Sequence, residues 1–268
     1  RFTADPLFAL GGLFGVHGGV SCTARNLFGR RNSIRAAAQV GGRQRYSLTL
    51  INPGFGPRSS LFLDIDLARD IYSYRYPDYS PDFKVDYTRM NLRVGYKFSR
   101  KIHAGFRAGT SVFTGSRAVT YSGMGSDRLI QAGFFARYDS RDWPVYPARG
   151  VVLMGAVDRE RVLSEKGFYR LRLRTQIYRR LVGTSILALE TMGTYSFGSV
   201  PVYRRLHIGG IRTIRGITAG SVSGENNLVV SAEYRIPVNY DRSYLRGFHG
   251  GWAVVLFFDA GKAWFSKT

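Results

Sequence analysis

The chain has 268 residues, of which 32 are glycine and 14% are aromatic, and its formal net charge is +21. Its longest uninterrupted apolar run, residues 252–258, is far shorter than the ~18 residues of a membrane-spanning helix, which excludes a helical membrane protein. The single cysteine, Cys22, excludes an internal disulfide and a cysteine-based metal site.

Nearly every segment alternates apolar and polar residues with a period of two, which is typical of β-strands with one polar and one apolar face. No helical period persists for three turns. In chain order we expect about thirteen strands, at roughly 8–17, 18–26, 32–41, 44–53, 60–72, 84–99, 101–115, 127–140, 150–162, 167–182, 184–197, 227–238 and 250–265. Many of these segments exceed the ~5–6 residues of an ordinary strand.

Two fold classes use strands of this kind. In a soluble β-sandwich or lipocalin-like barrel the apolar face forms a core, whereas in a membrane barrel it meets lipid and the polar face lines a lumen. Long strands, and tight turns that alternate with long loops at 73–83 and 199–226, favour the membrane. We therefore predict an all-β fold, a transmembrane antiparallel β-barrel, with residues 1–268 as a single domain.

The excess positive charge could mark a nucleic-acid binder or a charged barrel interior. A nucleic-acid binder would not need a second, wholly apolar face on its strands. We assign the charge to the lumen and loops and expect no nucleic-acid partner. Arg170, Arg172 and Arg174 share one face of segment 167–182, and we interpret them as a basic wall of the lumen that would attract anions.

Four short motifs, taken in chain order, resemble those of one family. They lie at residues 25–30 (Arg-Asn-Leu-Phe-Gly-Arg), 138–150, 209–217 and 257–261 (Phe-Phe-Asp-Ala-Gly). Together they resemble the signatures of BamA/TamA-type outer-membrane assembly barrels, the bacterial surface antigen superfamily, which is related to organelle import barrels. Within 209–217, Ile214 and Ile217 stand where the family usually has valine and an aromatic residue.

The resemblance implies that the loop carrying residues 209–217 folds back into the lumen, where Arg215 meets Glu233 and Asp259 on the inner wall. The alternation places both acids on the polar faces of their strands independently. A guanidinium binds carboxylates through a fork of charge-assisted hydrogen bonds, so such a cluster would hold the loop in place as a strut. The alternative is that Arg215 is one more lumenal arginine. Three glycines would let the backbone turn sharply beside the wall: Gly209, Gly210 and Gly216.

The motif at 138–150 has a structural interpretation. Asp139, Arg141, Asp142, Pro147 and Gly150 are residue types that build tight turns, and the three charged ones would pair locally. No Gly-x-Ser-x-Gly elbow occurs, and the four histidines show no ligand spacing. We therefore expect no enzyme activity, no metal and no cofactor.

The resemblance also implies about sixteen strands, so we expect last strands and upstream periplasmic domains outside this sequence. It implies a protein of the bacterial outer membrane, or of an organelle outer membrane, that inserts barrel proteins or translocates polypeptide. The implied partners are the lipid bilayer, unfolded outer-membrane or secreted polypeptides, and accessory assembly subunits. Two alternatives remain: a barrel that anchors or exports a fused or partner domain, and a passive, anion-preferring pore.

Overall fold

The computed structural model describes residues 2–9, 16–27, 32–52, 59–74, 83–163, 165–245 and 248–266. One continuous sheet of 13 strands makes up most of the molecule. Its strands are Phe2–Ala9 (β1), His17–Leu27 (β2), Asn32–Gly41 (β3), Arg43–Asn52 (β4), Leu61–Tyr74 (β5), Phe83–Lys97 (β6), Ile102–Thr114 (β7), Ser126–Asp139 (β8), Gly150–Val162 (β9), Gly167–Arg180 (β10), Ile186–Gly198 (β11), Asn226–Leu245 (β14) and Phe248–Trp264 (β15).

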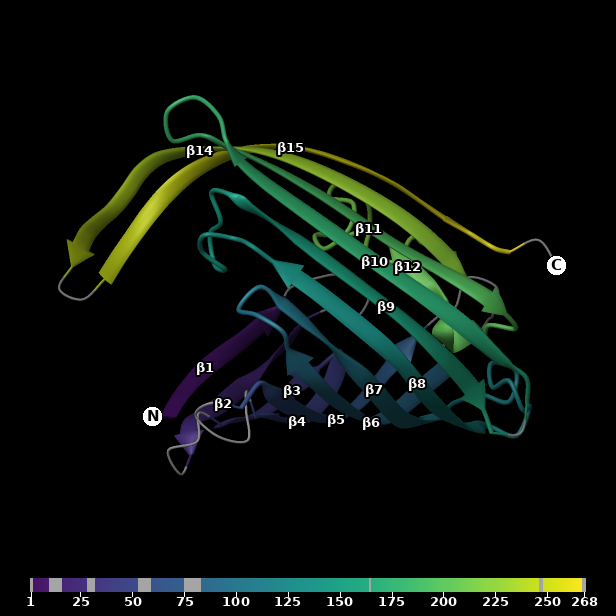
Figure 1. The fold of residues 1–268 in the computed structure, drawn as a ribbon. Helices are drawn as coiled ribbons and strands as arrows, with labels where there is room; N and C mark the ends of the chain where they lie inside the picture. Colours follow the sequence, from purple (N-terminus) through teal and green to yellow (C-terminus); the bar gives the residue numbers. More distant parts are fainter. Residues whose placement is uncertain are drawn as a thin grey trace.

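The sheet curves into a barrel wall around a lumen (Figure 1). Strands β1 to β11 follow one another in chain order and β14 and β15 continue the wall, with every neighbouring pair antiparallel. Within the described residues β1 pairs only with β2, and β15 only with β14. The predicted all-β antiparallel barrel is confirmed. In the described part of the chain, no helix has the length and apolar character needed to cross a membrane.

The first predicted strand, 8–17, is wrong. The structure places β1 at Phe2–Ala9 and starts β2 at His17. Asp5 and Pro6 disfavour a strand interior, so residue propensities placed the predicted strand after the observed one. Proline is tolerated here because an edge strand bonds a neighbour on one side only, and β1 is such a strand among the described residues.

The motif at 25–30 is only partly described. Asn26 has a φ of 59° and lies at a register shift of the β2–β3 ladder. Asparagine tolerates this left-handed conformation better than most residues. Phe28, Gly29 and Arg30 lie outside the described residues, as do residues 75–82 of the long loop predicted at 73–83.

The two faces of the sheet differ as the alternation predicts. The outer face carries exposed apolar side chains, among them Leu173 and the edge-to-face pair of Phe106 and Phe134, whose ring centroids lie 5.6 Å apart. Lipid covers such a band in a membrane barrel. The inner face carries ion pairs between neighbouring strands, for example Arg93 of β6 with Asp64 of β5 at 2.9 Å.

Two connections fold into the lumen. Residues 115–125, between β7 and β8, bury Val119 against Val85 and Phe113 of the wall. The connection between β11 and β14 adds Tyr203 to the same apolar cluster. Residues 199–226, predicted as one long loop, also contain a 3-10 helix, Val202–Arg204 (η1), and a small two-stranded sheet of Leu206–Ile208 (β12) and Val222–Gly224 (β13).

Candidate functional site: the infolded loop

The connection from β11 to β14, residues 199–225, is called the lumenal loop below. Its two short strands pair with each other and lie against β14 and β15 (Figure 1). Gly209 follows β12 with a φ of 113°, and a side chain there would place its Cβ 2.2 Å from the Thr218 carbonyl oxygen. Only glycine fits this turn. Gly210 and Gly216 also have positive φ, at 83° and 85°.

The tip of the lumenal loop brings together the three charged residues singled out in the sequence. Arg215 donates from Nη1 to Glu233 Oε1 at 2.6 Å. It donates from Nε and Nη2 to the two carboxylate oxygens of Asp259, each at 2.7 Å. The backbone N–H of Arg215 adds a further bond to Asp259 Oδ2 at 2.9 Å. Side-chain and backbone donors thus fix both the position and the rotation of the loop tip.

Three further residues, which the sequence analysis did not assign to this cluster, complete it. Ser231 Oγ accepts from Arg215 Nη2 at 3.0 Å and donates to Asp259 at 2.6 Å. Arg235 binds the other oxygen of Glu233 through two bonds of 2.8 and 2.6 Å. The Phe257 ring lies 3.8 Å from the Arg215 guanidinium carbon, which is close enough for a cation–π contact. The parity of residues 227–238 was a usable signal for Ser231 and Arg235, since both share the face of Glu233.

The electrostatics keep this cluster charged. The hydrogen bond to Asp259 raises the pKa of Arg215 above its usual range, against the opposing effect of burial, and the bond to Glu233 adds to the rise. A carboxylate pair favours the charged form of a guanidinium, and the guanidinium in turn favours the ionised carboxylates. The cluster is therefore a permanent ionic contact at physiological pH.

Apolar packing supports the tip beside the ions. Ile214 is buried with Ile208 of β12 and Val229 of β14. Ile217, which stands where the family usually has an aromatic residue, is instead 44% exposed. The tip is therefore anchored by Ile214 on one side and Arg215 on the other, while Ile217 contributes little packing.

A second contact holds the start of the lumenal loop to another part of the wall, and sequence reasoning missed it. Arg204 of η1 donates two hydrogen bonds to the wall. Its Nε binds Glu160 Oε2 at 2.9 Å, and its Nη1 binds the Tyr87 hydroxyl at 3.2 Å. Burial disfavours the charge on Arg204, but Glu160 together with Tyr87 and Tyr203 outweighs burial and holds the pKa of Arg204 above its usual value. Glu160 lies on β9 and Tyr87 on β6, both remote from β14 and β15 in the sheet.

Ring stacking reinforces this second contact. The Tyr203 ring stacks on Phe113 of β7 with centroids 4.0 Å apart and planes 9° from parallel. Burial, with a smaller effect of Asp127, raises the pKa of Tyr203, so its hydroxyl stays protonated. Nothing in the local sequence around Tyr203 and Arg204 distinguishes them from other loop residues. Their partners lie more than 40 residues away along the chain, which is why pattern reasoning could not pair them.

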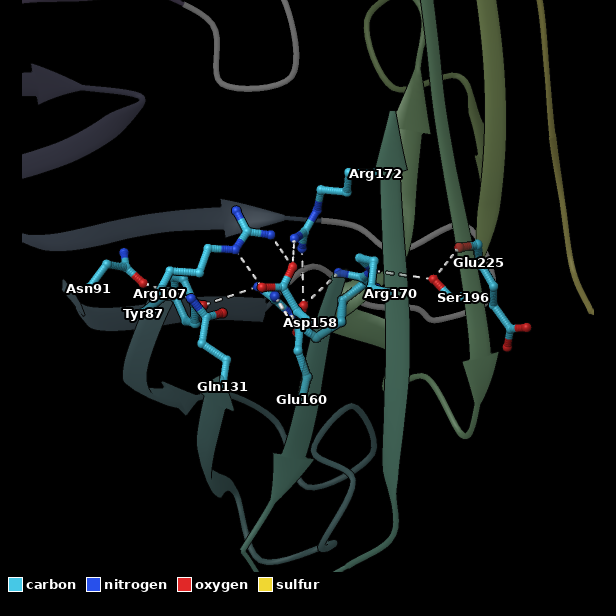
Figure 2. A network of polar contacts seen from close by, with 11 residues as sticks. Tyr87, Asn91, Arg107, Gln131, Asp158, Glu160, Arg170, Arg172, Ser196 and Glu225 are labelled. Atoms are coloured by element: carbon cyan, nitrogen blue, oxygen red, sulfur yellow. Dashed lines mark hydrogen bonds and ion pairs between the residues drawn. The ribbon is translucent and has the colours of Figure 1, made fainter. Parts of the chain in front are cut away.

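The arginines predicted as a basic ladder do share the inner face of β10, but each has an acidic partner. Figure 2 shows the contacts of Arg170 and Arg172. Arg170 is buried and donates to Glu160 at 3.5 Å and to the Arg204 carbonyl at 2.9 Å. Arg172 binds Glu160 at 3.0 Å and also contacts Asp158, which Arg107 of β7 shares. Arg174 binds Glu190 at 2.6 Å. The ladder is therefore one half of a mixed-charge wall.

The turn predicted at 138–150 is a local structure in which Asp139 pairs with Arg141, whereas Asp142 binds backbone groups and not the charged neighbours. Asp139 accepts from Arg141 at 3.0 and 2.8 Å. Asp142 caps the turn by accepting three backbone N–H bonds with one oxygen, from residues 143, 148 and 149 at 2.9, 3.0 and 3.2 Å. Pro147 is buried, and Gly150 has a φ of 115° that a side chain would strain.

A substitution at Asp142 tests this account of the turn. Asp142→Ala removes the shared acceptor and should lower the free energy of unfolding by about 1 kcal/mol, the usual contribution of such side-chain-to-backbone bonds. Asp142→Asn keeps an acceptor oxygen and should cost less. Backbone hydrogen bonds lower the pKa of Asp142 against the effect of burial, so its contribution holds above pH ~4 and fades as the pH falls through its folded value. Urea unfolding in detergent at pH 7 and pH 3 measures both effects.

Among the described residues, no group of three or more histidine, cysteine, aspartate or glutamate side chains is placed to hold a metal ion. The chemistry that the cluster supports is positional. Two ionic contacts hold one loop against two separate sectors of a barrel wall, with apolar packing beside each.

A family model described as the Omp85 superfamily domain matches residues 26–268 of this chain. Among solved structures, BamA from Haemophilus ducreyi lacking POTRA domains 1–3 is similar, with a TM-score of 0.75 and 15% identity, over 98% of this chain and 58% of that one. CdiB from Escherichia coli follows, with a TM-score of 0.71 and 11% identity, over 97% and 51%. CdiB from Acinetobacter baumannii has a TM-score of 0.59 and 16% identity, over 98% and 48%. No curated protein matches the sequence.

Proposed function

Because this chain belongs to the Omp85 superfamily and forms a bacterial outer-membrane β-barrel, we propose that it inserts barrel proteins into the outer membrane or moves polypeptides across it. Its substrates are unfolded outer-membrane or secreted polypeptides, and its partners are the bilayer and accessory assembly subunits. The chain spans about half of the solved structures it resembles, 48% to 58% of their lengths. The step involves no covalent chemistry.

The observation that carries this proposal is the lumenal loop, which the wall holds at its start and at its tip. Arg215 binds β14 and β15, and Arg204 binds β9 and β6. A loop fixed at two remote sectors of a wall keeps those sectors at a set separation, and it occupies the lumen between them. The mechanism that follows is positional: the loop braces the barrel while substrate engages it, and its release or retention governs passage.

Reconstitution tests the function directly. The full-length protein in liposomes, supplied with an unfolded outer-membrane protein, should convert that substrate to a form that migrates as a folded barrel on unboiled gels. Liposomes that contain an unrelated barrel of similar size set the background rate. If the substrate folds only at the background rate, insertion is ruled out. If it also fails to enter the liposome interior, translocation is ruled out as well.

A passive, anion-preferring pore is the second candidate, favoured by the net charge of +21. The lumenal loop and residues 115–125 argue against it, because they pack together inside the barrel around Val119 and Tyr203. We expect the intact protein to show small and infrequent openings in planar bilayers. The double substitution Arg204→Ala with Arg215→Ala should raise the open fraction, because both loop contacts are lost.

Arginine-lined walls favour anions, so the reversal potential of the opened variant in a KCl gradient should shift towards that of chloride. The exposed outer-face residue Arg69, paired with Asp86 at 2.6 Å, offers a control: Arg69→Ala should leave conductance unchanged. A large, steady conductance in the intact protein would favour the passive pore over the braced barrel.

A further inference from the structure

The lumen contains a cavity of about 470 Å³ bordered by the inner faces of β5 to β11 and β14. Thr213 of the lumenal loop also lines it. Its size lies within the ~300–1,000 Å³ of typical ligand pockets. Its lining mixes cationic and apolar side chains, among them Arg93, Arg137, Arg174, Phe62, Phe135 and Met154. The mechanism proposed above uses none of these six residues.

Three of the arginines that line this cavity have side chains more exposed than those of their acidic partners. The Arg93 side chain is 52% exposed and its partner Asp64 only 14%. Arg174 is 46% exposed against 26% for Glu190, and Arg137 is 38% exposed against 21% for Asp139. Asp64 also lines the cavity, so a molecule there meets five arginines and one carboxylate residue.

The strand registers place two of these cations, Arg137 and Arg174, in a row across the sheet, with an apolar residue between them. Arg137 of β8 lies opposite Met154 of β9, and Met154 lies opposite Arg174 of β10. The row continues from Arg174 to Met192 of β11 and on to Val229 of β14. Cationic and apolar groups thus alternate along the inner wall.

Aromatic rings extend the apolar part of the cavity. Phe62 and Phe135 meet edge to face with their centroids 6.1 Å apart. Methionine side chains are flexible and polarisable, and they adapt to apolar groups of different shapes. The wall therefore offers adaptable apolar contacts beside fixed positive charges. This combination suits ligands that vary in shape but share negative charge and apolar groups.

We propose that this cavity binds a segment of unfolded polypeptide in which carboxylate and apolar side chains occur close together. The proposal rests on the function proposed above and names the kind of substrate segment that the lumen accepts. The arginines form charge-assisted hydrogen bonds with the carboxylates, while Met154, Met192 and the two phenylalanines receive the apolar side chains. A free inorganic anion would use the guanidiniums but leave the apolar contacts empty.

Peptide binding to the full-length protein in lipid nanodiscs tests the proposal. The probe is a fluorescent peptide of alternating glutamate and leucine, and the matched peptides carry glutamine or lysine in place of glutamate. We expect the glutamate peptide to bind at least about tenfold more tightly than the glutamine peptide, with affinity that weakens as salt rises. The lysine peptide should not bind measurably. Equal binding of the glutamate and glutamine peptides would overturn the proposal.

Substitutions locate the binding. Arg93→Gln with Arg174→Gln removes two exposed charges and should weaken the glutamate peptide by about tenfold or more, while Arg69→Gln on the outer face should leave it unchanged. The gel mobility of the unboiled protein shows whether each variant keeps its barrel. Equal loss in the Arg69 variant, or no loss in the lumenal one, would contradict the site.

Photocrosslinking needs no change of charge and gives a second readout. A benzophenone amino acid in place of Met154 faces the cavity, and one in place of Leu153, the next residue, lies on the opposite face of β9. Crosslinks to the glutamate peptide should form from position 154 and be weak or absent from position 153. Equal crosslinking from both positions would show that the peptide has no preference for the cavity and would overturn the site. These results stand apart from the reconstitution assay, so assembly activity without peptide binding would reject this site and leave the proposed function intact.

Discussion

Arg215→Ala should release the tip of the lumenal loop from the wall. The substitution removes the side-chain bonds from Arg215 to Glu233 and Asp259 and leaves the Asp259 carboxylate, whose side chain is 2% exposed, without its cation. Breaking a buried ion pair in this way costs ~3–5 kcal/mol. We expect the free energy that docks the loop on the wall to fall by about 3 kcal/mol, near the lower end of that range. The loss is limited because the Arg215 side chain is 23% exposed and Glu233 keeps Arg235 as a partner.

Distances between spin labels report the position of the loop. Labels at Ile211 in the loop and Leu163 after β9 are both on exposed side chains, and Cys22→Ser removes the native thiol. The distance distribution should be narrow in the intact protein and broad or shifted in the Arg215→Ala variant. Arg215→Lys keeps one charge but cannot form the fork, so it should give an intermediate result.

Arg212→Ala is the matched control for this experiment. Arg212 lies three residues from Arg215 in the same loop and is exposed. Its substitution should leave both the distance distribution and the assembly activity unchanged. If Arg215→Ala behaves like Arg212→Ala in both measurements, Arg215 is one lumenal arginine among others and the brace is wrong.

Glu160→Gln should destabilise the barrel more broadly than the loop-tip substitution does. Glu160 is buried and lies between three guanidiniums, those of Arg170, Arg172 and Arg204. Glutamine fills the same volume but carries no charge, so three cations remain close together with Asp158 as the nearest acid. We expect a loss of ~3–5 kcal/mol in the free energy of unfolding, together with release of η1 from the wall.

Urea unfolding of the protein in detergent measures this loss, and Glu165→Gln serves as its control. Glu165 lies five residues along the chain, just past the end of β9, and is exposed. A second variant, Tyr203→Leu, removes the stacking on Phe113 without touching the charges. It should release η1 with a smaller loss of stability. A Glu160→Gln protein as stable as the Glu165→Gln protein would show that the wall does not need this carboxylate.

The strands were predictable because their signal is local. Side chains on a strand alternate between faces, so residues such as Arg170, Leu171 and Arg172 reveal their faces without any knowledge of their neighbours. The error at β1 has the same origin. Asp5 and Pro6 give a poor local signal, and only pairing with β2 makes residues 2–9 a strand.

The cluster at the loop tip needed more than alternation. The alternation of residues placed Glu233 and Asp259 on the polar faces of their strands. Only the resemblance joined them to Arg215, which lies 18 and 44 residues away from them along the chain. Ser231 and Arg235 followed the same parity, yet nothing in the pattern distinguished them from other polar residues on that face. The contact of Arg204 with Glu160 had no motif to carry it.

By itself, the sequence determined the all-β class, the two faces of the strands, and the polar strand faces on which Glu233 and Asp259 lie. Each of these depends on residue type and on spacing within a single strand or loop. Only the tertiary structure decided which charges meet across the lumen and that the loop touches two remote sectors of the wall. Those contacts depend on the combined register of successive strands around the barrel and on the path of the folded loop. Small offsets in either would move a guanidinium out of hydrogen-bonding range, because such bonds weaken steeply with distance and angle.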